Sequence, residues 1–231
     1  MTAAIDDIPL PSAVLFDLDG TLVDTVETRI SSWEQALAVA GLPTGRDRLA
    51  PLIGLDGTRL ASEIAALAGQ PIEDARAEEI DRHSGELYER LNLAPRPLPG
   101  LSRLVDELDR RGIRWAIATS SRKDQVRTSV EALGLRTEPT VVDASHVQHA
   151  KPEPDLLLLA AEQLGIAPAG CWYVGDATWD MVSAVAAGMI AVGVTAGSAM
   201  DAATLRAAGA AAVVETLDEI AGSIKARPRI P

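Results

Sequence analysis

The 231-residue sequence contains few cysteine, lysine, histidine and aromatic residues, and each shortage excludes something. Its single cysteine, Cys171, permits no internal disulfide, and the strand-like run around it predicts a buried structural thiol in a reducing compartment. Aromatic residues make up 3%, so the core must consist mainly of Ala, Val, Leu and Ile. The chain has neither a signal-peptide pattern nor an apolar run of about 18 residues. We therefore expect a cytoplasmic protein with no membrane partner.

Positive charge is also scarce, because 21 Lys and Arg residues stand against 33 Asp and Glu residues, giving a formal net charge of −12. Nucleic acids and anionic membranes bind basic surfaces, so we expect neither as a partner. A phosphate ligand must then be bound by a few local groups or by a cation. Hydrophobic residues at 47% and charged residues at 23% indicate an ordinary globular chain, long enough for one domain with an insert.

Apolar periodicity divides the chain into two kinds of structure. A buried strand is predicted at residues 14–16, and helical spacing follows up to the proline-rich segment 95–100. Beyond it, helix and strand patterns alternate to the C-terminus, which is typical of a parallel sheet built from βαβ units. Further strands are predicted at residues 114–119, 140–143, 171–176, 190–194 and 211–214, with helices near 101–111, 122–133, 153–164, 178–187 and 201–208. We predict a doubly wound, mainly parallel six-stranded α/β sheet (1–24 and 95–231) with an inserted α-helical cap domain (25–94).

Two carboxylates, Asp17 and Asp19, follow the first predicted strand at positions one residue apart. Gly20 comes next and favours a sharp turn, because glycine adopts backbone angles that other residues avoid. Open α/β sheets bind their ligands at the carboxyl ends of the strands, where these two acids would lie. A polar turn beside a helix cap is the alternative interpretation of this pair, so the other strand ends must decide.

Three further strand ends carry polar side chains. The hydroxyls at residues 119–121 either cap the next helix or help its free N–H groups to bind an anion. Lys151, one of only three lysines, precedes prolines that fix the local backbone, although a solvated surface lysine is the alternative. Asp176 ends an apolar strand as Asp17 does, whereas Asp180 could serve only the positive end of the next helix. In a doubly wound sheet all of these groups share one edge.

The combination of side chains at that edge indicates phosphate chemistry. Several carboxylate oxygens with no cluster of His or Cys favour a hard cation, by preference Mg²⁺. A cation, a lysine and hydroxyls around one point are the groups that bind a phosphoryl group. The sequence therefore predicts a magnesium and phosphate site.

In order and context, these segments resemble the motifs of the haloacid dehalogenase superfamily, specifically its phosphoglycolate phosphatase-like and β-phosphoglucomutase-like members with a helical cap. Residues 17–24 resemble the first motif, Thr119-Ser120 the second, Lys151-Pro152 the third, and Gly175-Asp176 with Asp180 the fourth. The resemblance covers nearly the whole chain. It implies a Mg²⁺-dependent phosphatase that hydrolyses a small phosphorylated metabolite.

The resemblance also implies roles for individual residues. Asp17 would be the nucleophile that forms an aspartyl-phosphate, and Asp19 the general acid and base. The metal would be held by the Asp17 side chain, the Asp19 main-chain carbonyl and Asp176. Lys151 would neutralise the phosphoryl charge and orient Asp17.

Two further roles concern binding and support. Thr119 and the Ser120 N–H would bind phosphoryl oxygens. Asp180 would lie behind the residues that contact the phosphoryl group and the metal, and would support Lys151 or a metal-bound water.

The residues of the predicted cap favour some activities of this superfamily over others. No lysine occurs in residues 25–94, which disfavours a phosphonoacetaldehyde hydrolase and weakens a β-phosphoglucomutase-type phosphosugar isomerase, because relatives with these activities use a cap lysine. The second acid, Asp19, disfavours a dehalogenase. In the cap helix marked by Ile80, Leu87 and Leu91, His83 is predicted to belong to the core. A phosphatase is the leading hypothesis, with the isomerase and a non-catalytic binding protein as alternatives.

Substrate choice is expected to depend on the cap loop at residues 52–59. Arg59 is its best candidate for binding a second anionic group, such as a carboxylate, and a solvated arginine beside a capping turn is the alternative. The residues 119–121 depart from the Thr-Asn-Lys pattern associated with phosphoglycolate phosphatases, which leaves small sugar phosphates open. No oligomeric state is predicted.

Overall fold

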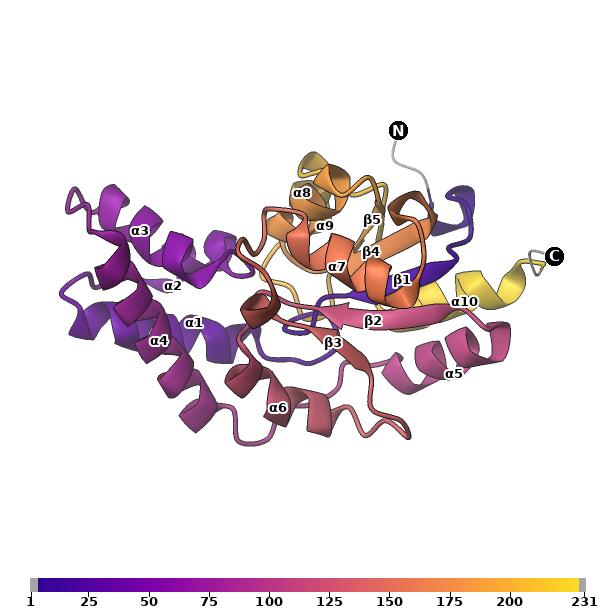
Figure 1. Cartoon of the computed structure of the whole chain (residues 1–231), viewed down its shortest axis with the longest axis horizontal. Helices are drawn as coiled ribbons and strands as arrows, with labels where there is room; N and C mark the ends of the chain where they lie inside the picture. The colour runs from indigo at the N-terminus through magenta and orange to yellow at the C-terminus, as the bar shows by residue number, and fades with distance from the viewer. Residues whose placement is uncertain (1–3, 229–231) are drawn as a thin grey trace.

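A six-stranded parallel sheet forms the centre of the computed structural model, which describes residues 4–228 (Figure 1). The strand order is β3-β2-β1-β4-β5-β6, and every neighbouring pair is parallel. The strands are β1 (Ala13–Phe16), β2 (Arg114–Ala118), β3 (Thr140–Val142), β4 (Cys171–Gly175), β5 (Ile190–Val194) and β6 (Ala212–Val214). The predicted doubly wound α/β sheet is confirmed.

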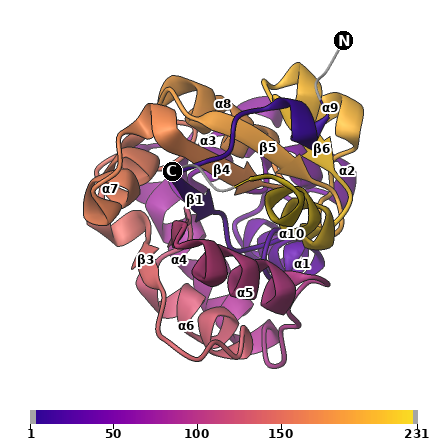
Figure 2. The same ribbon diagram turned by 90° about the vertical axis from the view of Figure 1, so that its right-hand side faces the viewer.

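Helices cover both faces of this sheet (Figure 2). Side chains of β1 alternate between the two faces, with Val14 and Phe16 in one apolar core and Leu15 in the other. The first core also contains residues of α5 (Leu101–Arg111), α6 (Lys123–Ala132) and α10 (Leu217–Ala226). The second contains residues of α7 (Asp155–Leu164), α8 (Thr178–Ala186) and α9 (Ala202–Ala207).

The central strand β1 sets the position of the site. It pairs with β2 on one side and with β4 on the other, so the order of the strands along the chain reverses beside it. Asp17 directly follows β1, and its main-chain N–H donates to the carbonyl of Val174 in β4 at 2.9 Å. Ligands of open α/β sheets bind at the carboxyl ends of the strands beside such a reversal.

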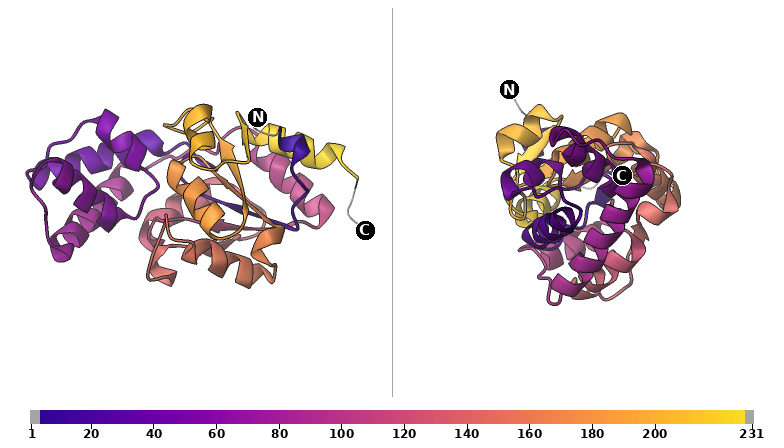
Figure 3. Two further views of the ribbon diagram at one scale, coloured as in Figure 1. Left: turned by 90° about the horizontal axis from the view of Figure 1, so that it is seen from above. Right: turned by 90° about the vertical axis from the view of Figure 1, so that its left-hand side faces the viewer.

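A cluster of helices extends from one end of the sheet (Figures 1 and 3). It consists of α1 (Val26–Val39), α2 (Arg46–Leu49), α3 (Gly57–Leu67) and α4 (Asp74–Leu91), which enclose an apolar core of their own. We call these helices and the segments that connect them the cap. The two connections to the sheet lie side by side, since the N–H of Leu98 donates to the carbonyl of Leu22 and that of Asp24 to Arg96. The all-helical insert after the first strand is therefore present as expected.

The helices differ from the prediction in two respects. The sequence pattern does not predict helices α2 and α10. The buried face of α4 also differs from the predicted one: Leu91 is 42% exposed, His83 is partly exposed rather than in the core, and Tyr88 is fully buried.

Among residues 4–228, no helix is both long enough and apolar enough to cross a membrane.

Candidate functional site

A pocket opens where the cap meets the carboxyl ends of β1, β2 and β4. Core residues on its wall are Asp17, Asp19, Thr119, Ser120, Ser121, Gln125, Lys151, Asp176 and Ala177. Cap residues on its wall are Arg29, Trp33, Ile53, Gly54, Leu55, Gly57, Leu60 and Asp81. We call this space the inner pocket. It brings together all the predicted site residues except Asp180, which lies behind Lys151, and Arg59.

Lys151 is at the centre of a cluster built only from the core. Its Nζ donates to Oδ1 of Asp17 at 2.6 Å, to Oδ1 of Asp180 at 2.7 Å and to the Tyr173 hydroxyl at 3.2 Å. The side chains of Lys151 and Asp180 are completely buried. The interpretation of Lys151 as a solvated surface lysine is therefore wrong.

Burial and charge act in opposite directions on this cluster. Burial disfavours the Lys151 ammonium, but the carboxylates of Asp17 and Asp180 outweigh this effect and raise the pKa of Lys151 well above its usual value. Burial raises the pKa of Asp17 to about 7, against the lowering effect of Lys151. Lys151 is thus a permanent cation beside a carboxylate that the protein holds away from water.

Asp176 adds a second carboxylate beside Asp17. Oxygens of Asp17, Asp176 and Asp180 lie within 4.8 Å of one another. Asp180 already accepts from Lys151 and from the Ala177 N–H, whereas Asp176 accepts from the Thr21 hydroxyl at 3.1 Å. Burial, with the nearby charges of Asp180 and Asp17, raises the pKa of Asp176 well above its usual value. Such an oxygen donor set, crowded and buried, fits a hard divalent cation.

Gly20 allows this close approach. Its φ is +80°, and a Cβ atom at this position would lie 2.3 Å from Oδ2 of Asp176. Any side chain here would be strained and would also displace the carboxylate. The predicted glycine turn therefore places the Asp17 loop against Asp176.

The hydroxyls after β2 do not cap α6. Its N-cap residue is Arg122, with no side-chain hydrogen bond to the helix. Thr119 Oγ1 accepts from the Ser121 N–H at 3.2 Å, and the Ser121 hydroxyl donates to Asp19 at 2.8 Å. The Ser120 hydroxyl is buried and has no hydrogen-bond partner among the described residues. Thr119, Ser120 and Ser121 instead line the inner pocket.

Asp19 is held by a second cluster, which the core shares with the cap. One oxygen accepts from the hydroxyls of Thr25 at 2.6 Å and Tyr88 at 2.7 Å. The other accepts from Ser121 and from Arg29, through Nη2 at 2.7 Å and Nε at 3.2 Å. Five donors therefore meet about four lone pairs. Burial raises the pKa of Asp19, but Arg29 and the hydroxyls outweigh it and hold that pKa below its usual value.

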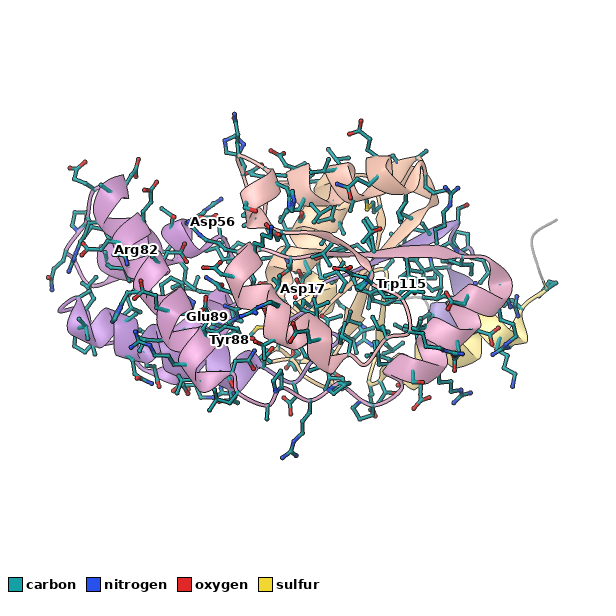
Figure 4. All side chains as sticks on the ribbon, turned by 60° about the horizontal axis from the view of Figure 1, so that its bottom comes forward. Asp17, Asp56, Arg82, Tyr88, Glu89 and Trp115 are labelled. Atoms are coloured by element: carbon teal, nitrogen blue, oxygen red, sulfur yellow. The ribbon has the colours of Figure 1, made fainter. Side chains whose placement is uncertain are left out.

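Arg29, Tyr88 and Gln125 also belong to the site, although the sequence motifs do not include them. Arg29 Nη1 donates to Gln125 Oε1 at 2.8 Å, and its guanidinium lies 3.4 Å from the centre of the Tyr88 ring. Figure 4 places Tyr88 on the cap side and Asp17 on the sheet side of the boundary. A signal for Arg29 was present, because a charged residue stands within the apolar helical stripe that includes Val26 and Trp33.

The cap also contacts the core through its main chain. The N–H of Asp56 donates to the carbonyl of Lys151 at 2.9 Å. At Gly54, a Cβ atom would lie 2.8 Å from the Cβ of Ala177. Both contacts position the cap loop over the inner pocket.

Arg59 lies outside the inner pocket. Its side chain is half-exposed in an adjoining cleft, which we call the outer cleft, and its Nη1 is 3.9 Å from Glu153. The outer cleft is also lined by Arg122, Glu78 and His149.

Comparison with known proteins adds independent evidence. Residues 14–194 match the family model described as haloacid dehalogenase-like hydrolase. The chain is 35% identical over 219 residues to a protein named probable phosphatase IndB from Dickeya dadantii (strain 3937), which covers 92% of this chain and 93% of that protein. It is 31% identical over 194 residues to β-phosphoglucomutase from Bacillus subtilis (strain 168), covering 81% and 85% respectively. A crystal structure of a hydrolase from Pseudomonas syringae matches with a TM-score of 0.87 and 32% identity, over 93% of this chain and 98% of that one.

Proposed function

The chain belongs to the haloacid dehalogenase-like hydrolases, and we propose that it is a Mg²⁺-dependent phosphatase that hydrolyses a small phosphorylated metabolite through an aspartyl-phosphate. The observation that carries this proposal is the Asp17 carboxylate. This carboxylate is buried and lies beside Asp176. It also accepts a hydrogen bond from the Lys151 ammonium, which is a permanent cation. The relative named as a phosphatase, which matches nearly the whole chain, supports the same reaction class.

A metal ion at this site would be held by the side chains of Asp17 and Asp176 and by the main-chain carbonyl of Asp19. When bound, Mg²⁺ would offset the repulsion between a carboxylate nucleophile and a phosphate dianion. Oxygens of Asp17 and Asp176 lie within 4.8 Å of each other, so a single ion between them could contact both.

In the proposed first step, an oxygen of Asp17 attacks phosphorus and the bond from phosphorus to the leaving oxygen breaks. Lys151 fixes the Asp17 carboxylate, and its charge balances that of the phosphoryl oxygens. Thr119 and the Ser120 N–H would bind these oxygens, and the position of both residues on the wall of the inner pocket supports that role. Water then cleaves the aspartyl-phosphate and releases inorganic phosphate.

Asp19 would give a proton to the leaving oxygen and later remove one from water. In this arrangement all its lone pairs are engaged and its pKa is low, so it is ionised. Before it can act as an acid, Asp19 must therefore take up a proton from water, which requires that the Ser121 hydroxyl first turns away from it.

Hydrolysis of p-nitrophenyl phosphate, measured with and without Mg²⁺, tests the proposal. We expect turnover that requires Mg²⁺ and is lost in Asp17→Asn, with circular dichroism confirming that the variant is folded. A folded protein with no Mg²⁺-dependent turnover would instead indicate the non-catalytic alternative. Full activity in Asp17→Asn would rule out the aspartyl-phosphate.

The similarity to β-phosphoglucomutase keeps a phosphosugar isomerase as the second candidate. Incubation with β-glucose 1-phosphate separates the two activities. A phosphatase releases inorganic phosphate, whereas the isomerase produces glucose 6-phosphate without releasing it.

A further inference from the structure

We infer that the inner pocket takes an uncharged, hydroxylated leaving group, such as a short polyol or a sugar, and rejects a carboxylate at the same place. This inference rests on the proposed phosphatase function. It concerns the part of the substrate that remains after the phosphoryl group has been transferred.

The first argument is that both cations of the inner pocket are already paired. Lys151 contacts Asp17 and Asp180, and Arg29 contacts Asp19. Among the described residues that line this pocket there is no third Lys or Arg. An anionic leaving group would therefore have to take a cation away from a carboxylate.

Arg29 is poorly suited to such an exchange. Its guanidinium is fixed on three sides, by Asp19, by Gln125 and by Ser121, and it stacks on the Tyr88 ring. If Arg29 turned to a substrate carboxylate, the buried Asp19 would lose its charged partner. Leaving one member of a buried ion pair unpaired is strongly unfavourable.

The second argument is the excess of negative charge. Three carboxylates of the inner pocket, Asp17, Asp19 and Asp176, face its two cations, while a fourth, Asp81, has its own partner in Arg122. A divalent ion would offset this excess of one negative charge, but the phosphoryl dianion then restores it. A further carboxylate on the leaving group would meet like charge at close range, which lowers affinity steeply.

The walls beyond the charged groups favour hydroxylated carbon. The cap contributes the apolar side chains of Trp33, Ile53 and Leu60, while Asp81 and Gln125 add groups that bond hydroxyls. Aromatic and apolar surface next to a few hydrogen-bonding groups suits a sugar or polyol. Arg59 and Arg122 line the outer cleft and not the inner pocket, and Arg122 is already paired with Asp81.

Two matched pairs of substrates test this inference. Glycerol 3-phosphate and 3-phosphoglycerate differ only by CH₂OH against carboxylate, and sorbitol 6-phosphate and 6-phosphogluconate differ in the same way. Phosphate release gives kcat/KM for each, and inhibition of p-nitrophenyl phosphate hydrolysis measures binding separately. We expect kcat/KM to be at least about tenfold higher, and the inhibition constant lower, for the uncharged member of the three-carbon pair.

A variant identifies the cause of the preference. Asp81→Asn removes one negative charge from the pocket wall and leaves Arg122 without that partner. We expect it to narrow the three-carbon ratio of kcat/KM by about three- to tenfold, mainly because the charged substrate has a lower Michaelis constant. Glu153→Gln is the matched control, because Glu153 also pairs with an arginine, Arg59, but does not line the inner pocket, so this variant should leave the ratio unchanged. If Asp81→Asn does not fold, the wild-type ratios of kcat/KM within the matched substrate pairs still test the inference.

Two results would overturn the inference. One is an equal or higher kcat/KM for 3-phosphoglycerate. The other is hydrolysis of neither uncharged compound while Mg²⁺-dependent turnover of p-nitrophenyl phosphate persists. Loss of that turnover in the folded wild-type protein would instead contradict the proposed function itself.

Discussion

Asp17 and Asp19 stand one residue apart, yet the protein holds them in two different ways. Asp17 belongs to a cluster made only by the core, in which Lys151 connects it to Asp180. Asp19 belongs to a cluster that the cap completes, through Arg29 and Tyr88. The first cluster is fixed by the packing of the sheet, whereas the second is complete only while the cap lies against the core.

This difference divides the chemistry between the two parts of the molecule. The residues around Asp17 would bind and accept the phosphoryl group, so their positions follow from the sheet itself. In the proposed mechanism the residues around Asp19 would control the proton, and their positions depend on where the cap lies. The cap would thereby influence proton transfer as well as the choice of leaving group.

Breaking the core cluster should have the largest effect. Lys151→Met leaves Asp17 and Asp180 as buried charges without a cation, and we expect a loss of about 3–5 kcal/mol in the free energy of unfolding. Phosphatase activity should fall by about 10³-fold or more, because a fixed charge at the reacting group is lost. Urea unfolding and turnover of p-nitrophenyl phosphate measure the two effects.

A second substitution provides the control for this prediction. Lys151→Met combined with Asp180→Asn removes one of the stranded charges, so stability should partly return while activity stays low. If the double variant were no more stable than Lys151→Met, the ion pair with Asp180 would not be the cause of the loss.

Breaking the shared cluster should cost less stability and affect catalysis differently. Arg29→Met leaves Asp19 with its hydroxyl donors, so we expect a loss of about 2–3 kcal/mol and a fall in kcat of about 10- to 100-fold. Arg29→Lys should recover little of kcat, because an ammonium cannot reach Asp19, Gln125 and Ser121 together. Full recovery by lysine would show that only the charge matters.

Arg46→Met is the matched control for Arg29. Arg46 also lies in the cap and pairs with Glu27, but both side chains are about half or more exposed. Exposed pairs contribute little, so the unfolding midpoint and kcat should remain those of the wild type.

Removing a single hydroxyl from the shared cluster should have a smaller effect. Tyr88→Phe deletes a donor to Asp19 and an acceptor for Asn92 but keeps the ring beneath Arg29. We expect a loss of about 1 kcal/mol in stability and a kcat lowered by about three- to tenfold. A change in KM alone would contradict the role of Tyr88 in positioning Asp19.

The smallest effect is expected at the edge of the interface between cap and core, where Asp81 pairs with Arg122 at 2.8 Å. Burial raises the pKa of Asp81 despite this pair. The folded protein therefore binds a proton there more tightly than the unfolded chain, and ionisation at higher pH reduces stability.

Asp81→Asn should consequently raise the free energy of unfolding at about pH 8 by up to about 1 kcal/mol, and the gain should vanish near pH 3, where both states are protonated. Thermal unfolding at both values of pH measures this. A loss of stability at the higher pH would show that the ion pair outweighs the burial of Asp81.

The difference between the core cluster around Asp17 and the shared cluster around Asp19 also explains which site residues could be predicted from the sequence. Asp17, Thr119 and Asp176 directly follow apolar strands, and the carboxyl ends of parallel strands meet at one edge, so strand patterns suffice to bring these residues together. Lys151 was placed there by its loop and its rarity.

The shared cluster depends on contacts between helices, which one-dimensional patterns describe poorly. Ile80, Leu87 and Leu91 suggested one face of α4, but the helix buries Ser84, Gly85 and Tyr88 as well as Ile80. Small residues allow the cap to approach the core closely: a Cβ atom at Gly85 would lie 2.2 Å from the Gln125 amide nitrogen. Hydrophobicity alone cannot identify a helix face that packs closely because its side chains are small.

The hydrogen bond from the Asp56 N–H to the Lys151 carbonyl has a practical consequence for engineering. It joins the loop before α3 to the core through main-chain atoms only, so it does not depend on which side chains this loop carries. Chimaeras that exchange the cap-loop residues between relatives should therefore keep this attachment, provided that the loop length is preserved. Substrate range could then be redesigned in the loop without rebuilding its junction with the core.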